Sequence, residues 1–171
     1  TCIAYLIADR QFKRKKLLNH HKFSRVKKHI IGAFVIQAII CAAIVMLFMP
    51  EQLFSLPISQ PFLWLSIVAI YPFFSALPQE LIFRTFIFHR YKAIFPKKRH
   101  RKLASAICFG FAHIIYNNWV AMLLSTLAGY YFAHAYSKYK STVLVALEHS
   151  LWGIWLFTVG LGGFFESSLI Y

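Results

Sequence analysis

Five apolar runs, separated by short basic or polar stretches, dominate the hydropathy pattern of this chain. They cover residues 30–49, 62–88, 103–116, 119–136 and 142–165. Most approach the roughly 20 residues that a helix needs to cross the hydrocarbon core of a bilayer. None shows the strict alternation of a barrel strand, and open strands would leave unpaired backbone groups in lipid. We therefore predict an all-α fold, a polytopic transmembrane helical bundle with about five spans.

Two of these runs have features that modify this prediction. A helix over residues 103–116 would reach only about 21 Å, which is short of a full bilayer. The second run contains Pro72 and Pro78, each of which removes a backbone donor. We expect a helix break just before Gln79, which would widen the bundle and admit water to the carboxylate of Glu80.

Composition and charge agree with a membrane protein. The sequence is 59% apolar and 18% aromatic, and its mean hydropathy is +0.58. Eighteen of its nineteen Lys and Arg residues lie in the stretches 10–28, 90–102 and 137–140, whereas the opposite loops contain none. This alternation places the basic stretches in the cytoplasm and explains the net charge of +14 without a nucleic-acid partner. The partners we expect there are membrane lipids.

The domain organisation is simple. We expect residues 1–29 to hold the end of a truncated apolar segment followed by a basic cytoplasmic loop, and residues 30–171 to form the transmembrane domain. The chain begins at Thr1 with an apolar stretch, which we interpret as part of a longer protein. Cys2, Cys41 and Cys108 show no metal or redox spacing, so we expect packed thiols and no disulfide framework.

Ionisable residues inside three of the apolar runs indicate a functional site. Such side chains are costly at bilayer depth and usually face the interior of a bundle. Glu80 and Arg84 are four residues apart and can pair on one helix face. For Glu148 in the last run, burial predicts a partner such as Arg84 or a shared water. We expect His113 and His149 to face Glu80 across a wet cavity.

This combination of groups permits two chemistries. A carboxylate beside two imidazoles provides a base to deprotonate water and a donor for the oxyanion formed in amide hydrolysis. The same three groups, Glu80, His113 and His149, could instead bind zinc with an open position for water. The spacing does not distinguish zinc from a site without a cofactor.

In their order along the chain, these residues resemble the motifs of the CPBP family of intramembrane proteases, also called the CAAX protease and bacteriocin-processing (Abi) family. The family motifs are Glu-Glu-x-x-x-Arg, Phe-x-x-x-His and His-x-x-x-Asn or Asp. Here they correspond to residues 79–84 (Gln-Glu-Leu-Ile-Phe-Arg), 109–113 (Phe-Gly-Phe-Ala-His) and 149–153 (His-Ser-Leu-Trp-Gly). The resemblance covers about residues 62–165.

The resemblance implies a multi-pass endopeptidase of a bacterial cytoplasmic membrane, acting on a peptide or protein substrate that is lipidated or membrane-bound. In the family, the first Glu and the second-motif His activate water, and the third-motif His and Asn stabilise the oxyanion, with a metal invoked in some accounts. Carried over, the catalytic set is Glu80, His113, His149, Arg84 and Gln79, and the substrate-binding set is Phe109, Glu148 and Gly153.

Two positions depart from the family pattern. Gln79 stands in place of the first Glu, and an amide cannot act as a general base near neutral pH. Gly153 stands in place of the third-motif Asn or Asp, which removes a donor or ligand. As a hypothesis, Glu80, or failing that Glu148, supplies the missing base.

Other functions remain open from the sequence. One alternative is a non-catalytic relative that binds peptide or lipidated partners, for bacteriocin immunity or trafficking. A transporter or proton relay would use the same intramembrane acids and histidines. Haem ligation between His113 and His149 is a further alternative.

Overall fold

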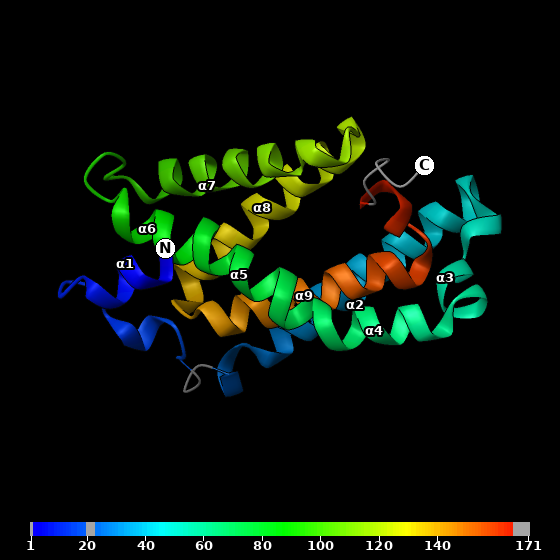
Figure 1. Cartoon of the computed structure of the whole chain (residues 1–171), viewed down its shortest axis with the longest axis horizontal. Helices are drawn as coiled ribbons and strands as arrows, with labels where there is room; N and C mark the ends of the chain where they lie inside the picture. Colours follow the sequence, from blue (N-terminus) through cyan, green and yellow to red (C-terminus); the bar gives the residue numbers. More distant parts are fainter. Residues whose placement is uncertain (1, 20–22, 166–171) are drawn as a thin grey trace.

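The computed structural model describes residues 2–19 and 23–165, which form helices joined by short loops (Figure 1). This confirms the predicted all-α fold. In chain order the elements are α1 (Cys2–Ala8), η1 (Arg14–Lys16), α2 (Phe23–Phe48), η3 (Pro50–Gln52), α3 (Ser55–Ser59), α4 (Pro61–Tyr71), η4 (Pro72–Ala76), α5 (Leu77–Glu80), η5 (Leu81–Phe86), α6 (Ile87–Arg90), α7 (Lys98–Ala112), η6 (His113–Tyr116), α8 (Trp119–Tyr139), α9 (Thr142–Val159) and η7 (Gly162–Phe165).

All five predicted runs are helical, and three of the described helices are long and apolar enough to cross a membrane. These are Phe23–Phe48, Pro61–Arg90 and Thr142–Val159. Helix α7 has 15 residues and would reach only about 22 Å. Helix α8 is longer, at 21 residues, but it contains serines, a histidine, a lysine and several tyrosines. The protein is therefore an integral membrane protein, with α7 and α8 as less apolar members of the bundle.

The two prolines do not break the second span. Residues Pro61–Arg90 form one continuous helix in which π-helical turns, η4 and η5, lie on either side of α5. A π turn absorbs an extra residue without ending the helix, and such turns are frequent at functional sites. A side chain of α7 supports the second one, because the hydroxyl of Ser105 donates to the carbonyl of Phe83 at 2.6 Å. The predicted break before Gln79 is thus wrong.

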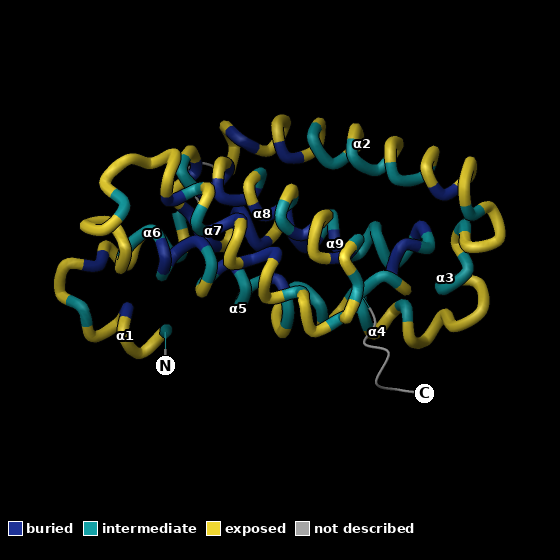
Figure 2. Tube along the Cα trace, turned by 90° about the horizontal axis from the view of Figure 1, so that it is seen from above, coloured by how far each residue is buried: buried dark blue, intermediate teal, exposed yellow. Residues whose placement is uncertain are grey.

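Helix α9 lies at the centre of the bundle, with contacts to α2, α4, α5 and α8. Half of its apolar stretch is buried, against 11% for α2 and 6% for the helix Pro61–Arg90. In Figure 2 the exposed residues of α2 lie along its outer side, and the buried residues gather where α8 and α9 run. The outward side chains of α2 are large and apolar, which suits contact with lipid.

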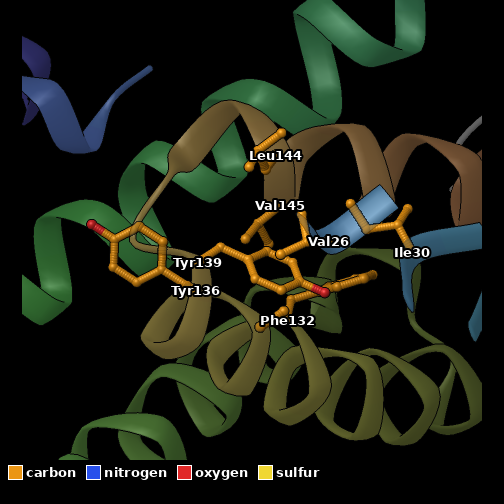
Figure 3. Close-up of a cluster of buried hydrophobic side chains, with 8 residues drawn as sticks. Val26, Ile30, Phe132, Tyr136, Tyr139, Leu144 and Val145 are labelled. Carbon is orange, nitrogen blue, oxygen red and sulfur yellow. The ribbon is translucent and has the colours of Figure 1, made fainter. Parts of the chain in front are cut away.

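The main cluster of buried apolar side chains joins α2, α8 and α9 near one end of the bundle (Figure 3). The cluster consists of Val26, Ile30, Phe132, Ala135, Tyr136, Tyr139, Leu144 and Val145.

Both α8 and α9 begin with a side-chain cap. The side chain of Asn118 accepts a hydrogen bond from the backbone N–H of Val120, and the side chain of Ser141 accepts one from the backbone N–H of Leu144.

Helices α7 and α8 pack closely because small residues lie between them. A Cβ atom on Gly110 would lie 1.8 Å from the hydroxyl oxygen of Thr126, and one on Gly129 would lie 3.0 Å from the ring of Phe109. Small residues allow this close approach between helices in a membrane. The contact at Gly129 holds the ring of Phe109 against α8.

The three basic stretches meet at one end of the bundle, where cations from all of them line a common cavity. Helix α1 is attached at this end, because the ring of His89 contacts the carboxylate of Asp9 at 2.7 Å. This arrangement agrees with the predicted placement of the basic stretches on one side of the membrane.

Candidate functional site

The centre of the candidate site is an ion pair within one helix. Nε of Arg84 lies 3.0 Å from Oε2 of Glu80, and both side chains are fully buried. The spacing of four residues places them on one face, in the order that also suits the helix dipole. The guanidinium donates to the carbonyl of Gly129 at 3.2 Å and lies 4.2 Å above the ring of Phe109. Arg84 therefore connects the second span to both α7 and α8.

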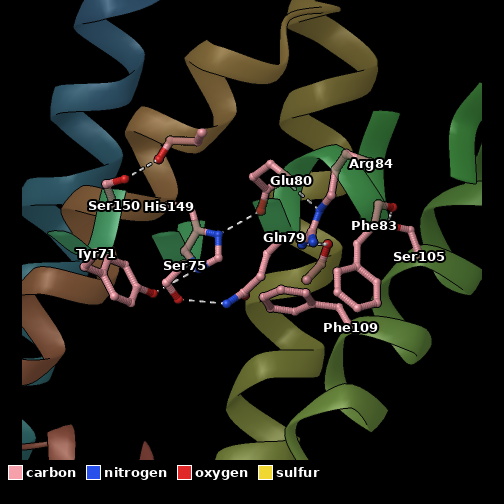
Figure 4. Close-up of polar contacts among 12 residues, drawn as sticks. Tyr71, Ser75, Gln79, Glu80, Phe83, Arg84, Ser105, Phe109, His149 and Ser150 are labelled. Carbon is pink, nitrogen blue, oxygen red and sulfur yellow. Dashed lines mark hydrogen bonds and ion pairs between the residues drawn. The ribbon is translucent and has the colours of Figure 1, made fainter. Parts of the chain in front are cut away.

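The same carboxylate orients His149. Nδ1 of His149 lies 2.8 Å from Oε1 of Glu80 (Figure 4). A carboxylate only accepts, so Nδ1 carries the hydrogen and Nε2 of the neutral ring has the lone pair. Nε2 lies 3.2 Å from the hydroxyl of Tyr71. The ring is stacked on Phe132 at 4.7 Å, which limits its rotation.

The second imidazole, that of His113, has its hydrogen on the same ring nitrogen as His149. His113 follows α7 at the first position of η6, and its Nδ1 lies 2.7 Å from the carbonyl oxygen of Phe109. A carbonyl also only accepts, so Nδ1 is again the protonated nitrogen and Nε2 is free. The ring centroids of His113 and Phe109 are 4.7 Å apart. Phe109 therefore lies between the two histidines, because its ring is also 5.6 Å from that of His149.

Both histidines line one partly open cavity of about 80 Å³, which is room for several water molecules. The predicted residues Gln79, Phe109 and Gly153 line it as well. Its walls also include Tyr71, Ser75, Phe132 and Trp152. The predicted convergence of His113 and His149 on one pocket is thus present in the structure.

Glu80 lies behind this cavity instead of lining it. Its side chain is fully buried, and its oxygens contact Arg84 and His149. Its neighbour in the chain, Gln79, faces the cavity instead, and the amide nitrogen of Gln79 donates to the hydroxyl of Ser75 at 2.9 Å. Glu80 thus has access to the cavity only through the ring of His149.

Gly153 faces the cavity at the position of the third-motif Asn or Asp, and a tyrosine fills the adjacent space. A Cβ atom on Gly153 would lie 2.3 Å from the hydroxyl oxygen of Tyr71. Tyr71 is a site residue that the sequence motifs do not identify. One signal was available, since Tyr71, Ser75 and Gln79 follow one another at intervals of four on one helix.

Glu148 does not belong to this cavity, which corrects its predicted place in the substrate-binding set. It is fully buried, and its Oε1 accepts a hydrogen bond from the hydroxyl of Tyr131 at 2.6 Å. Successive residues of a helix point about 100° apart, so Glu148 faces α8 where His149 faces Glu80. The partner found in the structure is Tyr131, in place of the predicted Arg84 or shared water.

The three side chains proposed as zinc ligands are not arranged to bind zinc. Within residues 2–19 and 23–165, no three His, Cys, Asp or Glu side chains are grouped so that they could hold a metal ion. The carboxylate of Glu80 is paired with a guanidinium, which would repel a cation placed beside it. Nδ1 of each histidine is bonded to a neighbouring oxygen atom.

The fold and the site define an all-helical membrane protein in which a buried glutamate and arginine support two histidines at a small cavity. Over residues 59–155, the chain matches the family described as type II CAAX prenyl endopeptidase Rce1-like. The match spans more than half of the chain and contains all three motifs, so the protein belongs to this family of endopeptidases. Neither the curated proteins nor the solved structures give a significant match.

Proposed function

We propose that this protein is an intramembrane endopeptidase with a variant site, in which imidazole groups take the place of the family's first glutamate. The observation that carries the proposal is that His113 and His149 line one cavity while their Nδ1 atoms are bonded elsewhere. The ring of His113 therefore has its Nε2 atom available to water or to a peptide group, whereas Nε2 of His149 contacts the hydroxyl of Tyr71.

In the proposed reaction His113 is the general base. Its Nε2 takes a proton from a water molecule, and the water oxygen attacks the carbonyl carbon of the scissile peptide bond. The carbonyl oxygen becomes an oxyanion. The proton then passes from Nε2 to the nitrogen of the leaving amine, the C–N bond breaks, and the products are a carboxyl group and an amine.

Two donors on the second span stabilise the oxyanion in this proposal. They are the hydroxyl of Tyr71, which would exchange its hydrogen bond to Nε2 of His149 for one to the oxyanion, and the second N–H of the Gln79 amide, whose first N–H donates to Ser75. Removing one preorganised donor of this kind lowers kcat by a factor of about 10²–10³. Glu80 is a positioning residue, because it fixes the tautomer and the orientation of His149.

We further propose a substrate with an apolar or lipidated segment next to the scissile bond. The name of the family refers to prenylated CAAX sequences. The cavity walls in this chain include Leu124, Phe132, Leu156 and Phe157, which offer apolar contacts on the path to the histidines. A peptide anchored in the membrane would reach this cavity without leaving the bilayer.

The test is cleavage of a farnesylated fluorogenic CAAX peptide by the purified full chain in detergent. We expect His113→Ala to lower kcat at least about 100-fold, the lower range for a general base. His134→Ala is the matched control, since His134 is exposed and contacts Lys102 outside the cavity. Each variant is first checked for an unchanged melting temperature. Full activity in folded His113→Ala, or activity lost on chelation and restored by zinc, would contradict the proposed mechanism.

A second candidate function is peptide binding without turnover. It is favoured by the two family positions that carry no catalytic group here, Gln79 with its amide bonded to Ser75, and Gly153 with Tyr71 against it. The same peptide distinguishes the two functions. Saturable binding with no cleavage, lost when Phe132 or Trp152 in the cavity wall is changed to Ala, would support the binding function.

A further inference from the structure

A second cavity lies at the basic end of the bundle, and its lining is strongly cationic. Its volume is about 450 Å³, and seven of its eleven lining residues are Lys or Arg. They come from four separate segments, and include Lys13, Lys16, Lys92, Arg101 and Lys140. Among the described residues, no Asp or Glu lines the cavity. The positive-inside rule explains why basic loops share one side of a membrane, but it does not require their side chains to converge on one cavity.

No carboxylate in the described part of the chain neutralises these cations. Among the described residues, none of the seven forms an ion pair with a carboxylate. The acid beside this end of the bundle, Asp9, is bonded to His89 and to the backbone of Gln11. The pKa of Lys16 lies below its usual value because of burial, and the charges of Lys13 and Lys140 lower it further. The cavity therefore has an uncompensated positive potential.

The hydrogen bonding of Arg101 indicates that this cavity binds a ligand. The side chain is 7% exposed, and one of its terminal nitrogens donates to the carbonyls of Phe95 and Pro96. Its Nε atom is buried without a partner among the described residues. A buried guanidinium nitrogen that lacks an acceptor is costly, so an acceptor from outside the protein would be stabilising.

The start of α7 adds to the same potential. Its N-cap residue, Lys97, provides no side-chain hydrogen bond, and the first turn contains no acidic residue. Lys98 and Arg101 lie there instead, at the end of the helix where the dipole favours negative charge. Uncapped amides at a helix N-terminus bind anions readily.

We propose that this cavity binds a phosphate group carried by an anionic ligand, either the headgroup of a phospholipid or a soluble phosphate compound. Several ammonium groups supply charge, and the guanidinium supplies directed donors to phosphate oxygens. The apolar side chain of Phe88 in the lining offers a surface for the non-ionic part of the ligand. This site is separate from the histidine cavity and does not depend on the proposed peptidase activity.

The first arm of the test uses inorganic pyrophosphate and the full chain in a neutral detergent, with binding measured by titration calorimetry. The test variant is Lys13→Gln/Lys92→Gln/Lys140→Gln, whose side chains are all exposed and line the cavity. The control is Arg25→Gln/Lys27→Gln/Lys28→Gln, which removes the same charge from exposed positions on α2. We expect the first variant to weaken binding about tenfold or more and the control to change it less than about threefold.

The second arm uses nanodiscs of phosphatidylcholine with and without phosphatidic acid, with retained lipid measured by native mass spectrometry after extraction. Retention of phosphatidic acid by the wild type and the control triple variant, but not by the cavity variant, would identify a lipid headgroup as the ligand. Pyrophosphate binding without such retention would identify a soluble phosphate compound. An equal effect of the two triple variants in both arms, or no saturable binding of either probe, would overturn the proposal.

Discussion

The hydroxyl oxygen of Tyr71 lies 2.3 Å from the position that a Cβ atom on Gly153 would take. Tyr71 is on the second span and Gly153 is on α9, so a residue from another helix fills the space next to the third-motif position. The same hydroxyl contacts Nε2 of His149 at 3.2 Å. The two departures from the family pattern, Gln79 and Gly153, therefore line one cavity together with Tyr71.

Because Tyr71 occupies the space beside Gly153, we predict that Gly153→Ala destabilises the protein by about 1–3 kcal/mol, the usual cost of overpacking. In a Tyr71→Ala background the added methyl group has room, and we expect most of that cost to disappear. The measurement is the free energy of unfolding from denaturant titration in micelles, taken through the full double-mutant cycle.

Gly32→Ala provides the control for this cycle. Gly32 lies in α2, and apart from its own stretch of helix no described heavy atom lies within 4 Å of the position that a methyl group there would take, so alanine should be neutral or stabilising. Equal destabilisation by Gly153→Ala in the presence and absence of the Tyr71 side chain would show that the two residues do not compete for this space.

The ion pair between Glu80 and Arg84 leads to a second prediction. Arg84→Gln leaves a fully buried carboxylate with His149 as its remaining hydrogen-bond partner, and we expect a loss of about 3–5 kcal/mol in unfolding free energy. Changing both residues to Gln removes both charges and should recover part of that loss. An exposed arginine, changed in Arg25→Gln, should alter stability by less than about 0.5 kcal/mol. A double variant less stable than Arg84→Gln would argue against charge burial as the cause.

A third prediction concerns the position that faces the cavity in place of the family's first glutamate. Gln79→Glu would put a carboxylate beside the two histidines, and a general base there is worth about 10²–10⁴ in rate. We expect faster cleavage of the farnesylated peptide, or new cleavage if the wild type only binds it. Gln79→Met, with similar size and no charge, should give no increase. An unchanged rate in folded Gln79→Glu would mean that this position does not contact the reacting water.

Most of the architecture was predictable because lipid restricts what a chain can do. Long apolar runs must satisfy their own backbone, so α2, α8, α9 and the helix Pro61–Arg90 followed from hydropathy alone. The pairing of Glu80 with Arg84 was equally accessible, since a spacing of four residues is a local property of a helix.

The parts that were not predictable depend on contacts between helices. The continuity of the second span through Pro72 depends on π turns. In one of these turns the carbonyl of Phe83 accepts a hydrogen bond from the hydroxyl of Ser105 on α7. The position of Tyr71 next to Gly153 depends on how two helices pack, and its spacing of eight residues from Gln79 indicates a shared helix face but not the neighbour on α9. Glu148 was misplaced for the same reason, because adjacency to His149 in sequence does not mean a shared face.

The attachment of α1 to the second span predicts a pH dependence. The pKa of Asp9 lies below its ordinary value of 3.8, first because the ring of His89 bonds to the carboxylate and then because the backbone of Gln11 donates to it. Because the pKa is lower in the folded state, this contact stabilises the protein at pH values above the ordinary pKa. The stabilisation is lost as the pH falls through the folded-state pKa. We therefore expect the melting temperature of the wild type to exceed that of Asp9→Asn at pH values above the ordinary pKa of 3.8, and to converge with it as the pH falls through the lowered folded-state pKa. His89→Gln removes the main hydrogen-bond partner of the Asp9 carboxylate, so it should weaken the dependence of melting temperature on pH in the same way as Asp9→Asn. Parallel melting profiles for the wild type and Asp9→Asn across this range would show that the contact with His89 does not contribute to stability.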